Sequence, residues 1–258
     1  MSVLMCANFS ACSEDDSGNG NDDGKKRIKK VVETDNNGTT TYECVYTYDG
    51  DGRLIAATET YNEEGEKFID IYQYCWTDGS IIITGESWSE HNGSASNSQT
   101  YSSTLILEGG LLQSIIDGYS TRTVTYNKDR IARIDINVNG TKDLLIRLNW
   151  NNDKLLSTQG YDRDVDLTYG VTCNKGFFPM MGSIIDGNTN DALFNAHPEL
   201  IGAYSNKLPT KMKNTSSRYE EENYTLGISY TFNNDGYIST AKMVADDGEV
   251  SSMTFTWK

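Results

Sequence analysis

Few residues of this chain have the spacing that catalysis or metal binding requires. The chain has 2 histidines, and neither His91, within the polar segment 90–94, nor His197, beside Pro198, belongs to an HExxH zinc pair. The sequence has no GxSxG nucleophile elbow and no Walker phosphate loop. We therefore expect one solvated histidine, one packed histidine, and a protein that is not an enzyme and uses no cofactor.

Two acidic segments carry the oxygen ligands that calcium prefers. Asp49 and Asp51 lie within Asp-Gly-Asp-Gly, while Asp164 and Asp166 share one face of an alternating segment, with Asp162 beside them. The first segment lacks the later ligands of a calcium loop, and solvent exposure explains the second. We favour a hairpin turn and a solvated strand face over a metal site. A hydrolase would need paired carboxylates from different strands, and it stays a third hypothesis.

Cys12 carries the most specific chemical signal in the chain. It follows Phe9-Ser10-Ala11, after a short apolar run, and an acidic segment follows it. This arrangement resembles a bacterial lipobox, whose cysteine is acylated, and each buried CH₂ of an acyl chain contributes about 0.8 kcal/mol to anchoring. We expect a truncated lipoprotein signal peptide over 1–11 and a flexible acidic tether over 12–26. The alternative is a disordered tail that happens to contain a cysteine.

Three cysteines would remain in the folded domain, namely Cys44, Cys75 and Cys173. They form no CxxC pair, which argues against a metal site. Cys44 alternates in phase with neighbouring tyrosines, so we expect a buried thiol. A disulfide between two of the three stays open, because an envelope compartment is oxidising.

The chain is acidic, with a formal net charge of −15. Residues 25–30 bring a local run of Lys and Arg, but repulsion from the rest of the chain argues against nucleic acid as a partner. We interpret this run as a solvated edge of the first strand. Such acidity suits a protein exposed to solvent at a cell surface.

From residue 27 to 258, apolar and polar residues alternate with the period of β-strands that bury one face. The pattern is clearest in the segments 133–138, 144–150, 164–169, 226–232 and 252–257. A turn phrase recurs between strands: an aromatic residue, then Asp, Asn or Gly, then a new apolar strand, as in 48–54 and 232–238. We expect one all-β domain, an antiparallel meander of about a dozen strands rolled into a barrel-like or strongly curved sheet.

Further copies of the phrase occur at 76–81, 126–131 and 150–155. The phrase resembles the YD-repeat pattern. Together with the lipobox and the acidic tether, it resembles a Bacteroidota outer-membrane lipoprotein family of unknown function with a porin-like fold. The resemblance covers most of residues 27–258. It implies an antiparallel β fold and an outer-membrane address, and it brings no established activity or catalytic residues.

A porin-like shape does not require insertion into a membrane. A transmembrane barrel turns its apolar face to lipid and needs strands of about 9 to 11 residues. Several alternating runs here are shorter, and charged residues interrupt both faces. A lipid anchor would also be redundant on a barrel that inserts itself. We therefore expect the apolar face of the sheet to lie inside.

A segment at about 170–208 interrupts the meander. Residues 191–202 predict a short helix, and Pro198 begins or breaks a second turn. Four apolar residues precede it: Phe177, Phe178, Met180 and Met181. We favour a plug for one end of the roll. The alternative is a ligand mouth, because Phe and Met side chains adapt to apolar ligands.

Trp88 stands out among the aromatic residues because its neighbours are polar. It is a candidate for stacking on a glycan, although a cross-strand contact explains it as well. With the anchor, these features predict a non-enzymatic, lipid-anchored binding or scaffold protein of the outer membrane that faces the cell exterior. Its partner would be a glycan, a nutrient or a membrane-complex protein. The alternative is an envelope carrier that holds a lipid or other small apolar ligand in a half-closed roll.

Overall fold

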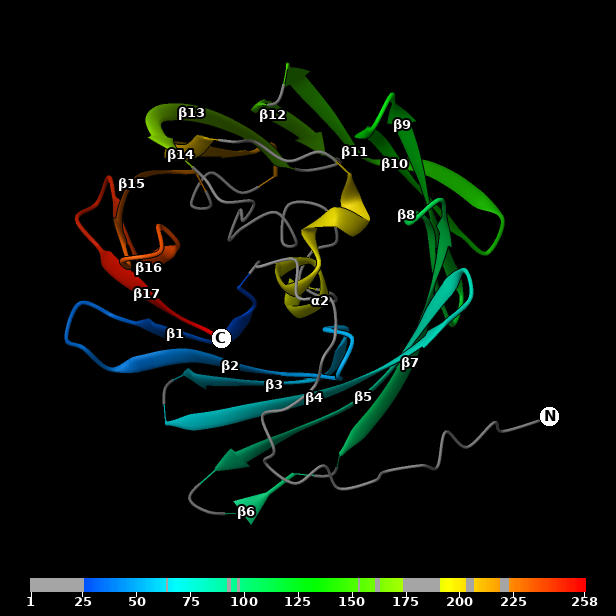
Figure 1. Cartoon of the computed structure of the whole chain (residues 1–258), viewed down its shortest axis with the longest axis horizontal. Coiled ribbons are helices and arrows are strands. Elements are labelled where there is room, and N and C mark those ends of the chain that lie inside the picture. Colours follow the sequence, from blue (N-terminus) through cyan, green and yellow to red (C-terminus); the bar gives the residue numbers. More distant parts are fainter. Residues whose placement is uncertain are drawn as a thin grey trace.

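A computed structural model describes residues 26–63, 65–91, 94–96, 98–152, 154–160, 163–173, 191–202, 207–218 and 223–258. Within these ranges the chain forms a ring of antiparallel strands around a short helix (Figure 1). In the described part, no helix is long and apolar enough to cross a membrane.

The strands follow one another around the ring in chain order. The first half of the chain forms β1 (Ile28–Thr34), β2 (Thr40–Tyr48), β3 (Leu54–Glu63), β4 (Glu66–Thr77), β5 (Ser80–His91), β6 (Ser94–Ala95), β7 (Gln99–Glu108), β8 (Leu111–Asp117) and β9 (Ser120–Asn127). The second half forms β10 (Arg130–Val138), β11 (Thr141–Asn151), β12 (Lys154–Gly160), β13 (Arg163–Cys173), β14 (Lys207–Ser216), β15 (Tyr224–Phe232), β16 (Ile238–Ala245) and β17 (Val250–Trp257). Two short helices, α2 (Asp191–Ala196) and the 3₁₀ helix η1 (Pro198–Ile201), stand between β13 and β14.

Strand pairing closes the sheet into a barrel. β1 pairs with β17 in a register that places Val31 opposite Phe255. The short β6 pairs only with β5, so the closed ring has 16 strands. The predicted all-β antiparallel fold is therefore confirmed, and the sheet closes completely. The sequence predicted only about a dozen strands because the hairpins at one end of the barrel lack the aromatic turn phrase.

Apolar side chains point into the barrel. On β17, Phe255 is buried, while Thr254 and Thr256 beside it face solvent. On β14, Met212 is buried and both of its neighbours are exposed lysines. The same alternation continues around the ring, and the inward side chains form one core cluster. A barrel that spans a membrane shows the opposite arrangement, with its apolar side chains outside. The apolar face lies inside, as predicted.

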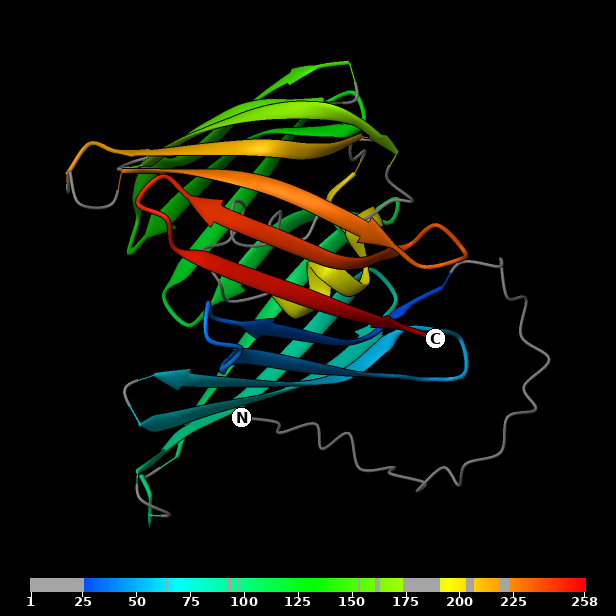
Figure 2. The same ribbon diagram turned by 90° about the vertical axis from the view of Figure 1, so that its left-hand side faces the viewer.

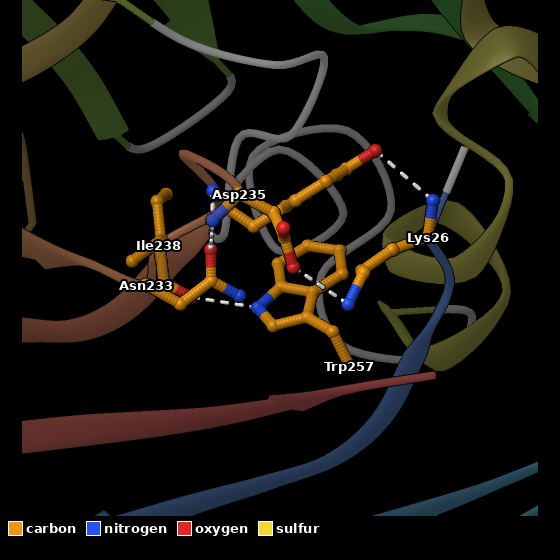
Figure 3. Close-up of polar contacts among 6 residues, drawn as sticks. Lys26, Asn233, Asp235, Ile238 and Trp257 are labelled. Carbon is orange, nitrogen blue, oxygen red and sulfur yellow. Dashed lines mark hydrogen bonds and ion pairs between the residues drawn. The ribbon is translucent and has the colours of Figure 1, made fainter. Parts of the chain in front are cut away.

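The turn phrases form tight turns at one end of the barrel. In the β15–β16 turn, Asn233 Oδ1 accepts hydrogen bonds from the N–H groups of Asp235 at 3.1 Å and Tyr237 at 2.9 Å (Figure 3). Gly236 has a φ of 81°, a conformation that glycine adopts without strain. Asp49 makes the equivalent hydrogen bonds in the β2–β3 turn. The Asx and Gly residues of the phrase are therefore explained by the turn.

Aromatic side chains near the ends of six strands hydrogen-bond to a backbone carbonyl near the start of the preceding strand. The indole N–H of Trp257 donates a hydrogen bond to the carbonyl oxygen of Ile238 at 2.6 Å (Figure 3). The same contact joins Trp76 to Leu54 (2.8 Å), Trp150 to Ile131 (2.7 Å), Tyr48 to Ile28 (2.9 Å), Tyr126 to Leu112 (2.7 Å) and Tyr230 to Pro209 (2.8 Å). A buried carbonyl needs a donor. At these six positions the indole N–H of Trp or the hydroxyl of Tyr supplies that donor.

The insertion closes the end of the barrel at which the turn phrases lie, called here the plugged end. α2 lies inside the ring of strands, toward the end at which β17 stops (Figures 1 and 2). Leu193 and Phe194 are at most 2% exposed and belong to the core cluster. Gly202, just after η1, forms an isolated β-bridge with Arg130 at the start of β10. The described part of the insertion is therefore a plug. The opposite end is called the far end.

Candidate binding site in the barrel interior

Three tyrosines form a row on the inner wall, across strands β2 to β7. The register places Tyr46 beside Ala57, Ala57 beside Tyr72, Tyr72 beside Gly85, and Gly85 beside Tyr101. Large and small side chains alternate, and a Cβ atom on Gly85 would collide with the ring of Tyr101. The rings of Tyr72 and Tyr101 meet edge to face, with their centroids 5.8 Å apart. This set is called the tyrosine row.

Glu59 lies on the inner face of β3, two residues beyond Ala57 of the tyrosine row. Its side chain is buried, with 1% exposed. Oε1 accepts a hydrogen bond from the Tyr42 hydroxyl at 2.9 Å, and Oε2 accepts one from the Tyr61 hydroxyl at 3.0 Å. The two tyrosine rings are 5.0 Å apart. Both oxygens of the carboxyl group are therefore held by phenol donors.

The surroundings of Glu59 are acidic. Burial raises the pKa of Glu59 to about 7; the two tyrosine hydroxyls oppose the shift, and the charges of Asp191 and Asp70 add to it. Asp70 lies directly opposite Glu59 on β4. Burial raises the pKa of Asp70 as well, against a hydrogen bond with Ser87. Like charges opposite each other on one sheet face repel. In the part of the chain that the structure describes, none of the groups that shift the pKa of Glu59 is a Lys or Arg.

A buried hydroxyl group lies on the inner face of β4, the strand that carries Asp70. Tyr74, on the inner face of β4, is 5% exposed, and its oxygen has no hydrogen-bond partner in the described part of the chain. Its ring stacks on Tyr72, with 6.4 Å between centroids. Burial raises the pKa of Tyr74, and the nearby charge of Glu59 adds to the shift. An unpaired buried hydroxyl costs about 1–3 kcal/mol. A bound molecule that supplied a partner would remove this cost.

A cavity of about 1260 Å³ reaches the tyrosine row. Gly85 and Tyr101 belong both to the row and to the lining of the cavity, which also includes Asp117, Tyr119 and Arg122. The cavity lies where one strand is longer than its neighbour, since residues 99–102 of β7 pair with β5 and extend beyond the end of β8. Gln73, Thr84 and Glu86 also line this space, and by alternation they lie on the outer face of β4 and β5. The tyrosine row therefore borders an open space at the edge of the sheet, near the far end.

Both oxygens of Glu59 already accept hydrogen bonds, so neither is poised to take a proton from a substrate. Carboxyl and phenol groups on a largely buried wall can bind a small molecule through hydrogen bonds, charge and ring contacts.

His197 joins the plug to the barrel wall. Its ring is buried, and Nε2 accepts a hydrogen bond from the backbone N–H of Leu54 at 3.0 Å. Because Nε2 is an acceptor, the ring proton is on Nδ1, which donates to Glu199 Oε1 at 2.8 Å. The Trp76 ring packs against the imidazole edge, 4.9 Å between centroids. The prediction of a packed histidine is confirmed, and its role is to position the plug.

The residues predicted as ligand contacts are not brought together in the described structure. Trp88 lies on the outer face of β5, opposite Ile69 of β4, and so away from the tyrosine row. The lipid-attachment residue Cys12 and the apolar group Phe177, Phe178, Met180 and Met181 lie outside the described residues. In the described ranges, no group of three or more His, Cys, Asp or Glu is placed to hold a metal ion.

The two cysteines whose side chains are described, Cys44 and Cys75, lie on opposite faces of the sheet. Cys44 is buried inside the barrel, as predicted, and burial raises the pKa of its thiol. Cys75 alternates with the inward Tyr74 and Trp76 and therefore faces outward, so no disulfide joins it to Cys44. The side chain of Cys173 lies outside the described ranges.

Sequence reasoning missed Glu59, Asp70 and Tyr74 as a group. The alternation of β3 could have identified Glu59, because it places Glu59 on the same inward face as Ala57 and Tyr61. An acidic residue at an inward position conflicts with the apolar pattern, and such conflicts are expected at functional sites. Only the pairing register of β3 and β4 shows that Asp70 lies opposite Glu59.

One of two similar solved structures supports the fold. A solved structure of a porin-like protein from Bacteroides uniformis has a TM-score of 0.62 and 16% sequence identity, with 90% of this chain and 96% of that chain covered. A porin-like protein from Bacteroides vulgatus has a TM-score of 0.34 and 10% identity, covering 91% of this chain and 99% of that chain. No protein-family model matches the sequence, and no curated protein matches it.

Proposed function

We propose that the chain is a non-enzymatic binding protein, held at the outer membrane by a lipid on Cys12, that takes a small polar molecule into its barrel from the far end. The observation that carries this proposal is the buried acid and tyrosine wall beside a cavity, in a barrel whose other end is plugged. A nutrient or a glycan fragment fits such a wall, because tyrosine rings stack on sugars and phenols hydrogen-bond to hydroxyl groups.

The outer face of the barrel supports anchoring rather than insertion. Thr, Ser and charged residues predominate there, as on β14, where Lys211, Lys213 and Thr215 are exposed. Lysine on the lipid-facing side of a membrane barrel costs about 2–4 kcal/mol at the bilayer midplane. A lipid on Cys12 would hold such a barrel at the membrane without burying these groups.

The position of Lys26 supports one orientation. Its Nζ atom lies 2.7 Å from Asp235 Oδ2, and its backbone N–H donates to the Tyr237 hydroxyl at 3.0 Å (Figure 3). These contacts place the start of the described chain at the plugged end. A flexible tether over 12–26 would span roughly 20 Å on average. The plugged end would then face the membrane, and the far end would face the cell exterior.

The anchor is tested with the full chain in a Gram-negative host that exports and acylates lipoproteins. We expect wild type and Cys6→Ser, the matched control, to carry acyl chains and to fractionate with the outer membrane. Cys12→Ser should lose both properties, and protease added to whole cells should digest the wild-type barrel. Unmodified Cys12 in membrane-bound protein would contradict the anchor, and protection from protease would contradict the orientation.

Binding is tested by native mass spectrometry of the full chain, isolated in mild detergent, before and after denaturation. A polar molecule released on denaturation would support the proposal. A released fatty acid or other apolar molecule would favour the carrier alternative. If no molecule is released and glycan arrays give no signal, the binding function is wrong, and capture of a membrane-complex protein by cross-linking becomes the next experiment.

A further inference from the structure

We propose that the inner wall around Glu59 binds an alkylammonium group, the positively charged end of a small organic molecule. This inference rests on the proposed binding function and adds the chemical class of the ligand. Three separate features of the wall support it: its unbalanced acids, its tyrosine rings and an unpaired hydroxyl.

The first feature is the facing pair of carboxyl groups. Glu59 and Asp70 lie opposite each other on neighbouring strands, and Glu59 is 1% exposed. Asp191 contributes further negative potential at Glu59, and within the described ranges no Lys or Arg is among the groups that shift its pKa. A bound cation would stabilise the ionised pair. The net charge of −15 also raises the local concentration of small cations around the protein.

The second feature is a set of aromatic rings on both sides of Glu59 along the barrel. Tyr42 and Tyr61 lie toward the far end, with their rings 5.0 Å apart and tilted by 45°. Tyr72 and Tyr74 lie toward the plugged end, nearly parallel at 20°. Ring faces attract ammonium groups, and this attraction contributes more when the cation is desolvated. A neutral polar ligand would make the same ring contacts but would lack this attraction between a positive charge and the ring faces.

The third feature is the hydroxyl of Tyr74. It is buried and has no hydrogen-bond partner in the described part of the chain. The lone pairs of its oxygen could accept an N–H of an ammonium group. This feature does not depend on the acids, because the phenol is neutral.

A ligand would reach this wall through the cavity described above. Tyr101 lines the cavity and meets Tyr72 edge to face. Tyr42, Tyr61 and Tyr101 are each only partly buried, whereas Glu59 and Tyr72 are buried. Burial therefore increases from the cavity toward the acids, and an alkylammonium ion would enter with its charged end toward Glu59.

The test uses calorimetric titration of the full chain with n-butylammonium and with n-butanol, which has the same chain length and no charge. We expect butylammonium to bind about tenfold or more tightly than butanol, the ratio that corresponds to about 1.4 kcal/mol. Glu59→Gln keeps the hydrogen-bonding shape and removes the charge, so it should lose about tenfold in affinity for butylammonium. Glu63→Gln, on the exposed end of the same strand, should bind as wild type does.

Tyr74→Phe provides a second variant that is expected to fold, since it removes only an unpaired oxygen. It should weaken butylammonium severalfold and leave butanol unchanged. Equal affinity for butylammonium and butanol, or unchanged affinity in Glu59→Gln, would overturn the ammonium assignment. A neutral polar molecule found by native mass spectrometry would then leave the binding function standing, so the two proposals fail separately.

Discussion

His197 Nε2 accepts a hydrogen bond from the backbone N–H of Leu54 at 3.0 Å, across 143 residues of sequence. Leu54 begins β3 directly after a turn phrase, and its carbonyl oxygen accepts the Trp76 indole. The backbone of Leu54 therefore makes two hydrogen bonds, one with His197 of the plug and one with the indole of Trp76. The imidazole of His197 is thus one contact that positions the plug, and both of its nitrogen atoms make hydrogen bonds.

Replacing His197 tests this dependence. His197→Ala leaves the buried N–H of Leu54 without an acceptor and removes a ring that packs on Trp76. We expect a loss of roughly 2–4 kcal/mol in the free energy of unfolding, measured with urea. His197→Gln can return an oxygen acceptor and should lose less. Equal losses in the two variants would show that the hydrogen bond to Leu54 does not hold the plug.

The pH dependence of stability tests the state of Glu59. Burial raises its pKa from 4.5 to about 7, so the folded protein holds this proton more tightly than the unfolded chain does. The resulting stabilisation is fully present below pH 4.5 and is lost as the pH rises through about 7. At about 1.4 kcal/mol per pKa unit, the free energy of unfolding should change by roughly 3 kcal/mol over this pH range.

Glu59→Gln removes this titration. Its free energy of unfolding should therefore rise relative to that of wild type between pH 4.5 and about 7. Urea unfolding of both proteins across this range gives the difference, and titrations that the two proteins share cancel. A difference that does not change with pH would mean that Glu59 ionises normally in the folded protein.

The aromatic contacts at the strand ends should each contribute to stability. Trp150→Phe keeps an aromatic ring and removes the donor to the Ile131 carbonyl, 2.7 Å away. We expect a loss of about 1–3 kcal/mol, because the carbonyl would stay buried without a partner. Tyr119→Phe is the control, since Tyr119 is 80% exposed. If both variants unfold at the same urea concentration, the indole hydrogen bond is not stabilising.

Gly202 should tolerate no side chain. Its φ is 85°, and a Cβ atom would collide with the carbonyl oxygen of Asp129. We expect Gly202→Ala to break the bridge to Arg130 and to increase hydrogen exchange in α2 and η1 by about tenfold or more. Gly50→Ala, at a turn position with open space around it, is the control. Unchanged exchange in Gly202→Ala would show that the plug can shift to accept the methyl group.

Much of the fold could be predicted from the sequence because its main determinants are local. Alternation predicts that Phe255 and Ile134 share the buried face of their strands, and Asn233 with Gly236 predicts a turn. Closure could not be predicted, because the pairing of Val31 with Phe255 joins residues 224 positions apart and leaves no local signal. The strand count was low for a related reason, since turns such as Gly140 after Asn139 lack the aromatic phrase.

The candidate site could be predicted only in part. The inward phase of Tyr46 and Tyr72 was visible in their alternation. The meeting of Glu59 with Asp70 and of Gly85 with Tyr101 depends on which residue faces which across strands. Alternation fixes a face but not a partner, so the sequence favoured Trp88 instead, which lies on the outer face.

The contact between β1 and β17 also has a consequence for how the chain folds. Most of the other strand pairs of the ring join strands that are close along the chain and can form early, as hairpins. Until the last pair forms, both strands are unprotected edges that could pair with another molecule. Barrel closure is therefore the step most exposed to aggregation, and folding yield should fall as protein concentration rises during refolding.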